Sequence, residues 1–228
     1  MNANDILVLP LNMNNLEKHQ DALNKVLAHF GKLDVLINNA ARYQNTLFEE
    51  CTLEMERSLF ETNVFGVINL TRIAVKHWLS TKTKGHLVVT SSISGFSGSP
   101  ASSAYAATKH ALHGFYDSIR VEYAHRGIDV SLICPGPVET ELLTKSLMPD
   151  GMSPPEDPKF RFKIMKAERC AFLYSVAIAN RVNLAWIVPQ PYLTMAILAQ
   201  YMPFFSRWVI KFLVSEEKVR EVANGNYS

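Results

Sequence analysis

Blocks of apolar and polar residues follow one another along the chain and predict strands that alternate with helices. Short apolar runs with few polar interruptions are typical of strands buried on both faces, and they occupy residues 6–10, 33–37, 86–90, 128–134 and 184–188. Between them, apolar residues recur with helical spacing over residues 16–30, 53–82, 104–126 and 167–180. This alternation predicts an α/β fold, in which helices cover both faces of a parallel sheet.

The remaining segments are less regular. Residues 146–166 are rich in Pro, Lys and Met, and we expect a mobile loop there. Residues 182–206 carry no charge and are long enough to span a bilayer, but they contain three prolines and several amides. We therefore expect a strand at 184–188, followed by an apolar helix that caps a pocket. From Ser215 the tail is polar.

Length and charge narrow the classes of protein. The 228 residues fit a single domain, with residues 184–228 as its last strand plus a helical extension. The net charge of +2 argues against a nucleic-acid partner, which would need many phosphate contacts. Three widely spaced cysteines predict neither a disulfide framework nor a metal site. His110 and His113, three residues apart, are expected to pack on a helix rather than bind metal.

Tyr105 and Lys109 form the first candidate for chemistry. Their spacing of four places the phenol and the ammonium on one helix face, one turn apart. A nearby ammonium favours the phenolate and would lower the pKa of Tyr105, which suits acid–base work. Alone, the pair is a weak signal, and a solvated helix face is the commoner explanation of this spacing.

Other polar residues follow predicted strands. Ser92 comes directly after the strand at 86–90, thirteen residues before Tyr105, and Asn39 follows the strand at 33–37. Pro135, Gly136 and Pro137 close the strand at 128–134. Ligands of open α/β sheets bind outside the carboxyl ends of the strands, so these residues are expected to share a site.

Taken together, these motifs resemble the short-chain dehydrogenase/reductase family. The matching pieces, in the family's order and spacing, are Asn38-Asn39-Ala40-Ala41, Asn63-Val64-Phe65-Gly66, Ser92, Tyr105-xxx-Lys109 and Pro135-Gly136-Pro137-Val138-x-Thr140. The resemblance covers about residues 5 to 145 by motif. It implies a Rossmann-like, doubly wound, three-layer fold.

The resemblance also implies an activity, namely hydride transfer between a nicotinamide dinucleotide and a carbonyl or alcohol. Tyr105 would be the acid or base, Lys109 would lower its pKa and hold the ribose hydroxyls, and Ser92 would polarise the substrate oxygen. Asn63 would hold a water in a proton relay through Lys109. The implied cofactor contacts are Asn12, Asn39, Ala40, Ala41, Tyr105, Lys109, Pro135, Gly136, Val138 and Thr140.

The sequence departs from the family at its front. The family's Gly-rich turn, TGxxxGxG, holds the pyrophosphate at a helix N-terminus, and no such pattern occurs here. Residues 1–12 instead match the family's third strand, with Asn12 at the position of the adenine-contacting acidic residue. The first two strands and helices are expected to be missing. Residues 5–10 would lack pairing partners, the sheet would have an open edge, and dinucleotide binding would be weak.

Softer motifs resemble one branch of the family, the dehydrogenase/reductase member 7 type. They are the segment 133–138, the Met- and Pro-rich loop and the stretch 200–203. Members of this branch are microsomal and reduce steroids, retinoids or quinone-like carbonyls. The resemblance therefore implies a lipophilic substrate, in keeping with Met148, Met152 and Met165, which could equally be ordinary packing methionines. It favours NADP(H) over NAD(H), although the discriminating residue is absent.

Further partners follow from the same reasoning. The apolar, aromatic stretch 192–214 contains two basic residues and suits a membrane-surface contact or a subunit contact. Family members pair through the helices that hold Asn63 and Tyr105, so a homodimer is expected. The resemblance places the protein at the endoplasmic reticulum membrane, or in the cytoplasm if the chain is complete as given.

Two functions stay open from the sequence. The set of Asn63, Ser92, Tyr105 and Lys109 favours an oxidoreductase. The missing Gly-rich turn favours a catalytically impaired, shortened form that acts as a binding or dimerisation module.

Overall fold

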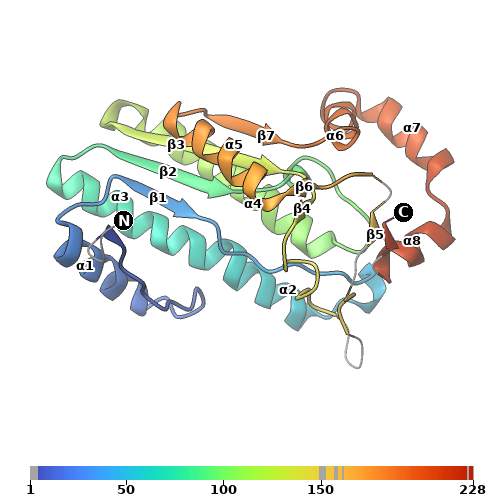
Figure 1. Cartoon of the computed structure of the whole chain (residues 1–228), viewed down its shortest axis with the longest axis horizontal. Coiled ribbons are helices and arrows are strands. Elements are labelled where there is room, and N and C mark those ends of the chain that lie inside the picture. Colours follow the sequence, from blue (N-terminus) through green and yellow to red (C-terminus); the bar gives the residue numbers. More distant parts are fainter. Residues whose placement is uncertain (1–4, 149–152, 157–158, 161, 225, 228) are drawn as a thin grey trace.

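A parallel sheet of four strands forms the centre of the computed structural model, which describes residues 5–148, 153–156, 159–160, 162–224 and 226–227 (Figure 1). The strand order is β1-β2-β3-β7, and each neighbouring pair is parallel. The strands are β1 (Val35–Asn38), β2 (Gly85–Thr90), β3 (Ile128–Pro135) and β7 (Leu184–Ile187). The predicted parallel sheet is therefore confirmed.

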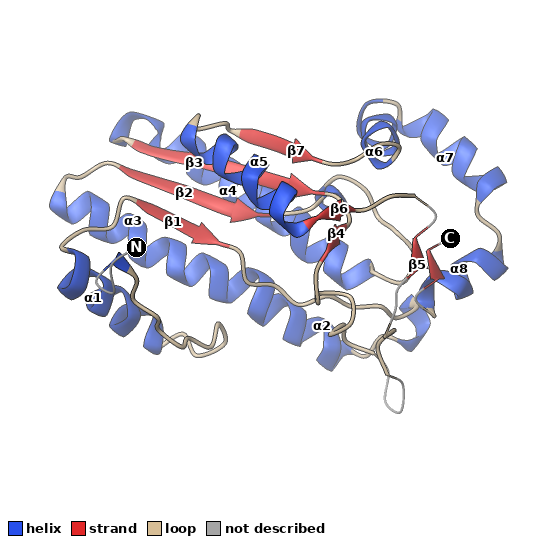
Figure 2. Ribbon diagram, in the orientation of Figure 1, coloured by secondary structure: helices blue, strands red, loops and turns tan. Residues whose placement is uncertain are grey.

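Helices cover both faces of this sheet (Figure 2). On one face, α3 (Val67–Thr81) and α4 (Ser103–Tyr123) pack on residues such as Leu87 and Val89 of β2. α1 (Lys18–Phe30) packs on α3. On the other face, α5 (Ala167–Ala179) packs on the intervening residue, Val88. Successive residues of a strand point to opposite faces, so the apolar runs of the sequence supply both interfaces of a three-layer fold.

The predicted first strand is wrong. Residues 6–10 lie in neither a helix nor a strand, and Ile6 and Val8 are largely exposed. Among the described residues the sheet ends at β1, which pairs only with β2, so this apolar run has no ladder to join. The expected open edge is confirmed, and it leaves Val35 and Ile37 of β1 part-exposed.

The helix expected over residues 53–82 is divided by a wider turn. α2 (Leu53–Phe60) leads into η3 (Glu61–Gly66), a π-helical stretch, and then into α3. Single π-turns inside α-helices are uncommon and occur frequently at functional sites. Asn63 lies in this stretch, and its side chain is buried.

The C-terminal part differs from its prediction in two ways. The expected apolar helix is two helices, α6 (Tyr192–Tyr201) and α7 (Pro203–Leu213), because Pro203 fits the first turn of a helix but not its interior. The polar tail contains a third, α8 (Glu216–Ala223), whose N-cap Ser215 accepts a hydrogen bond from the Lys218 amide. A serine followed by two glutamates is a helix-start signal that the sequence offered.

Short elements complete the chain and shape the expected loop at 146–166, part of which lies outside the described residues. Two of its short strands pair in parallel with strands outside it, β6 with β4 and β5 with β8. These elements and the short helical turns are η2 (Phe48–Glu50), η4 (Ile93–Gly95), η5 (Ala124–Arg126), β4 (Val138–Glu139), β5 (Lys159–Phe160), β6 (Met165–Lys166) and β8 (Asn226–Tyr227).

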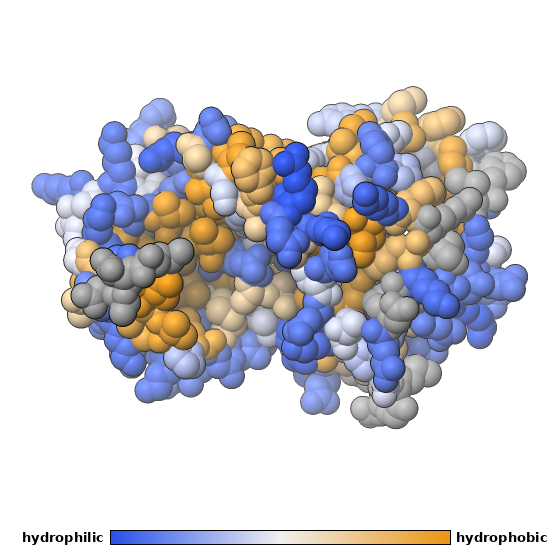
Figure 3. Space-filling model, viewed as in Figure 1, coloured by the Kyte–Doolittle hydropathy of each residue, from blue (hydrophilic) through white to orange (hydrophobic). Residues whose placement is uncertain are grey.

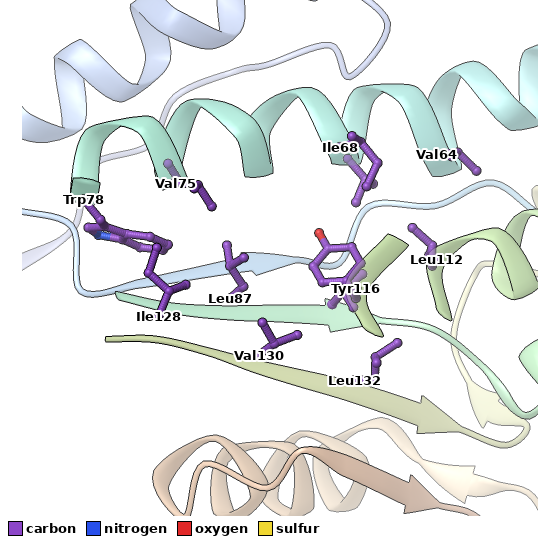
Figure 4. Close-up of a cluster of buried hydrophobic side chains, with 13 residues drawn as sticks. Val64, Ile68, Val75, Trp78, Leu87, Leu112, Tyr116, Ile128, Val130 and Leu132 are labelled. Carbon is purple, nitrogen blue, oxygen red and sulfur yellow. The ribbon is translucent and has the colours of Figure 1, made fainter. Parts of the chain in front are cut away.

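The larger of the two described core clusters fills the space between the sheet and the helices α3 and α4 (Figure 4). Trp78 and Tyr116 are completely buried in it. The indole Nε1 donates to the carbonyl of Leu33 at 2.6 Å, and the Tyr116 hydroxyl accepts from Asn38 Nδ2 at 2.9 Å. Each polar atom of these large rings thus has a partner, which removes the cost of burying it.

We expect Gly85→Ala to destabilise the fold, because a methyl group on Gly85 at the start of β2 would overlap the Trp78 ring. Overpacking of this kind costs about 1–3 kcal/mol in the free energy of unfolding, measured by urea denaturation. The matched control is Gly98→Ala, where nothing lies within 4 Å of the new methyl group. Equal stability of the two variants would show that the Trp78 ring moves aside at little cost.

Candidate active site

A large cavity of about 1540 Å³ opens at the carboxyl ends of the central strands. Residues that follow β1, β2 and β3 line it, as expected for an open α/β sheet. It brings together most of the residues that the sequence indicated, which are Asn39, Ala40, Ala41, Ser92, Tyr105, Lys109, Pro135, Gly136, Val138 and Thr140. Asn12 and Asn63 do not line it.

Tyr105 and Lys109 lie on the first turns of α4, and both are almost fully buried. The Lys109 Nζ atom is 5.5 Å from the centre of the Tyr105 ring, which confirms that they share one helix face. Nζ also donates a hydrogen bond to the carbonyl of Thr90, at the end of β2, at 2.8 Å. This bond ties the face of α4 that carries Tyr105 and Lys109 to the end of β2 at the cavity.

Burial controls the protonation of both groups. Removal from water raises the pKa of Tyr105 well above its ordinary value, although a hydrogen bond with Ser92 opposes this. The same desolvation lowers the pKa of Lys109 to about 8. Lys109 is not among the groups that shift the pKa of Tyr105 here, so the expected lowering of that pKa by Lys109 stays a prediction. Tyr105 is a neutral phenol with a proton to donate.

Ser92 is held at the end of β2 by the turn that follows it. It is the N-cap of η4, and its Oγ atom accepts a hydrogen bond from the Ser94 amide at 3.1 Å. Its hydroxyl also lies near that of Tyr105 and lowers the pKa of that phenol. The two hydroxyl groups therefore meet on the cavity wall, where one substrate oxygen could contact both.

Asn63 connects the active-site elements from behind the cavity. Its Oδ1 atom accepts from the Arg42 amide at 2.8 Å, and its Nδ2 atom donates to the Arg42 carbonyl at 2.9 Å. Nδ2 also donates to Thr108 Oγ1 at 3.2 Å, next to Lys109. Asn63 thus joins the segment after β1 to α4, while the relay of protons through it stays a prediction.

Asn12 is not brought to the site. It is exposed, and its Oδ1 atom accepts from the Asn14 amide in a local turn. The expected cofactor contact depended on a strand at residues 6–10 that would carry Asn12 to the sheet edge, and that strand does not form.

Sequence reasoning missed Gln44, which is completely buried. Its Oε1 atom accepts from the amides of Ala104 and Tyr105, at 3.0 and 3.3 Å. The first amides of a helix have no partner within it, and the local N-cap of α4, Ser102, supplies no side-chain bond. The cap comes from 60 residues away in the chain, so no local pattern could have revealed it.

Thr90 and Tyr174 were also missed. The Thr90 hydroxyl donates to Asn39 Oδ1 at 2.9 Å and bonds the hydroxyl of Tyr174, on α5, at 2.5 Å. Because the Thr90 carbonyl also accepts from Lys109, this residue links β1, α4 and α5. All four side chains line the cavity.

His113 contacts Ser91, the residue before Ser92. Its Nε2 atom lies 2.8 Å from Ser91 Oγ, beside Ser92, and burial lowers the pKa of this histidine to about 4. It is therefore neutral. No group of three or more His, Cys, Asp or Glu residues that could hold a metal occurs within the described part of the chain.

Comparisons with known proteins agree with this geometry. The model of a family described as short chain dehydrogenase matches residues 1–149. The human protein "Dehydrogenase/reductase SDR family member 7" is 37% identical over 206 residues, which cover 90% of this chain and 60% of that protein. The branch indicated by the softer motifs is thus confirmed, and the chain spans about 60% of the length of this relative.

Solved structures of related proteins have the same fold. A short chain dehydrogenase/reductase from Burkholderia phymatum in complex with NAD superposes with a TM-score of 0.74 at 21% identity, over 89% of this chain and 77% of that chain. The protein ElxO with NADP bound superposes with a TM-score of 0.68 at 28% identity, over 81% of this chain and 77% of that one. On its motifs, its fold and its matched residues, the chain belongs to the short chain dehydrogenase family.

Proposed function

We propose that this active site interconverts a carbonyl and an alcohol on a lipophilic, steroid- or retinoid-like substrate, with a nicotinamide dinucleotide as cofactor. The observation that carries the proposal is the meeting of Ser92, Tyr105 and Lys109 on the wall of one mostly apolar cavity. The relatives are oxidoreductases by name, and two structural neighbours hold NAD or NADP.

The cavity suits the nicotinamide and ribose end of such a cofactor. At about 1540 Å³ it exceeds the roughly 300–1,000 Å³ of ordinary small-molecule pockets, which leaves room for a cofactor and a substrate. Ala40, Ala41 and Gly136 have small side chains or none, and so leave space in the cavity. Asn39 and Thr140 offer hydrogen-bonding side chains. The sequence has no TGxxxGxG turn for the diphosphate, so we expect the affinity of this chain for the dinucleotide to be weak.

In reduction, Tyr105 donates its phenolic proton to the substrate oxygen, and in oxidation it takes a proton from the alcohol. Ser92 bonds the same oxygen and withdraws charge from it. Lys109 holds a positive charge beside the site below about pH 8 and favours the negative charge that develops on oxygen. The nicotinamide, when bound, supplies or accepts the hydride.

The remaining wall of the cavity favours an apolar substrate. Most of it is built from aromatic and aliphatic side chains of the C-terminal half, which are Leu142, Leu143, Phe160, Phe162, Ile178, Tyr192, Met195, Val214 and Val222. Of the three methionines expected at a pocket edge, Met148 and Met165 do not line the cavity and Met152 lies outside the described residues. We favour NADP(H) over NAD(H) because this branch of the family tends to use it.

A membrane surface is the second partner that we propose. Large apolar side chains on α6 and α7 are exposed, and orange residues gather there at the upper right of Figure 3. They include Tyr201, Met202, Phe204, Phe205, Trp208 and Ile210, which we call the α7 surface. The charged residues of the segment 192–214 are Arg207 and Lys211, so every charge in it is positive. Aromatic and basic residues together suit the headgroup region of an anionic bilayer, such as that of the endoplasmic reticulum.

None of the described helices combines the length and the hydropathy that crossing a bilayer requires. The α7 surface accordingly supports a contact in the plane of the membrane. A homodimer through α2, η3 and α4 stays a further proposal, supported by the exposed side chains of Phe65, Phe115 and Val121.

We expect Tyr105→Phe to lower kcat/KM by at least about 10²-fold, because it removes the proton donor and leaves the ring. The measurement is NADPH oxidation with retinal or a steroid ketone, at saturating dinucleotide. Tyr123→Phe, at the end of α4, is the matched control and should keep full activity. Full turnover by Tyr105→Phe would refute the assigned role. A wild-type chain without turnover would favour a binding module instead.

We expect Lys109 to make stability depend on pH between about 8 and 10. The folded protein releases the Lys109 proton near pH 8, whereas the unfolded chain keeps it until its ordinary value of 10.5. The free energy of unfolding therefore rises with pH in this window, by up to about 2 kcal/mol relative to Lys109→Met. Denaturation of both proteins at several pH values measures the difference. Lys76→Met, at an exposed lysine of α3, should follow the wild type; a parallel course for Lys109→Met would contradict the assignment.

We expect the protein to co-sediment with vesicles that contain phosphatidylserine, and less with pure phosphatidylcholine. The double variant Phe204→Ala/Trp208→Ala should lose about tenfold or more in vesicle affinity, because it removes exposed aromatic area from the α7 surface. The control is Phe48→Ala, which removes an equally exposed ring from η2. Equal loss from both variants would mean that binding is not located at α7.

A further inference from the structure

The C-terminal end of the chain returns to the active site. Val214, Lys218, Val222 and Tyr227 line the same cavity as Ser92 and Tyr105. They come from the end of α7, from α8 and from β8, which lies beside β5 in Figure 1. These elements follow the last strand of the sheet, so the fold itself does not require them to close this wall.

Tyr227 anchors this segment. Its hydroxyl donates to Asn45 Oδ1 at 3.2 Å, and its ring stacks on Phe160 with the centres 4.9 Å apart and the planes within 9°. Asn45, nearly completely buried, also donates from Nδ2 to the carbonyl of Ala223 at 3.0 Å. One asparagine of the segment after β1 thus holds both the last residue of α8 and the strand that follows.

Tyr43 connects the anchor to the catalytic residue. Its hydroxyl is buried and lies near the hydroxyls of Tyr227 and of Ser102, the residue before α4, both of which influence its pKa. Its ring meets the ring of Tyr105 edge to face, with the centres 4.7 Å apart and an angle of 68°. A ring with contacts at both its edge and its hydroxyl moves little. The Tyr43 ring therefore restricts the movement of the Tyr105 ring on the side where the two are in contact.

We propose that Tyr43 is a positioning residue for Tyr105, and that Tyr227 makes this positioning depend on the seating of the C-terminal segment on the cavity. The inference rests on the proposed function for the catalytic role of Tyr105. Its consequence concerns specificity, because the segment that orients the catalytic phenol is also a wall of the substrate site. A substrate that fills the cavity against Val222 holds the segment in place and keeps Tyr105 aligned.

The first test needs no turnover. The protein is labelled with 3-fluorotyrosine at its eight tyrosines, and the ¹⁹F resonance of Tyr105 is assigned by its loss in Tyr105→Phe. Tyr227→Phe removes one hydroxyl and keeps the ring that stacks on Phe160. We expect it to shift or split the Tyr105 resonance, and Tyr123→Phe to leave that resonance in place. An unmoved Tyr105 resonance in Tyr227→Phe would overturn the inference, whether or not the proposed activity exists.

The second test separates positioning from a general loss of structure. We expect Tyr43→Leu, which removes the ring, to lower kcat about tenfold or more while KM for the dinucleotide stays within about twofold, because the chemical step depends on alignment. Tyr43→Phe and Tyr227→Phe should lower kcat by smaller, similar factors, and their combination should add little, since each removes one of the two hydroxyls of a single contact. Unchanged kcat in Tyr43→Leu, or fully additive effects in the double variant, would overturn the inference.

Discussion

The burial of the first turn of α4 is the constraint on which the active site depends. Tyr105 and Lys109 lie on this buried turn, where the amides lose the water that would satisfy them. Gln44 resolves the conflict by accepting from two of these amides. The segment after β1 must therefore pass directly in front of α4, and the contacts of Tyr43, Asn45 and Asn63 follow from that path.

Desolvation also sets the chemistry of the site. It keeps Tyr105 protonated, and it brings the pKa of Lys109 to about 8. On the protein surface, water would stabilise the ammonium of a lysine, and its pKa would not be lowered in this way. Inside the cavity, the charge is retained because the Thr90 carbonyl accepts from it.

The sequence predicted the elements whose signal is local and failed where the signal is long-range. The strands after residue 30 and the helices that cover them follow from periodicity, and the site residues at strand ends follow from topology. The run at residues 6–10 has the composition of a strand, but a strand needs a partner, and β1 has none on that side. Gln44 and Tyr227 carry no motif, because their roles exist only once distant segments are side by side. The start of α8 and the division of α6 from α7 at Pro203 were signalled locally and overlooked.

The free edge of β1 has a consequence for handling the protein in solution. Within the described residues, no strand pairs with its outer side, where the side chains of Val35 and Ile37 are part-exposed, and such an edge is the template that intermolecular β-pairing uses. Lys32 and Asp34 stand just before this strand and carry opposite charges on exposed side chains. Such charges act as gatekeepers against aggregation at low concentration. A solvent-exposed strand edge of this kind favours association between copies of the chain as its concentration rises.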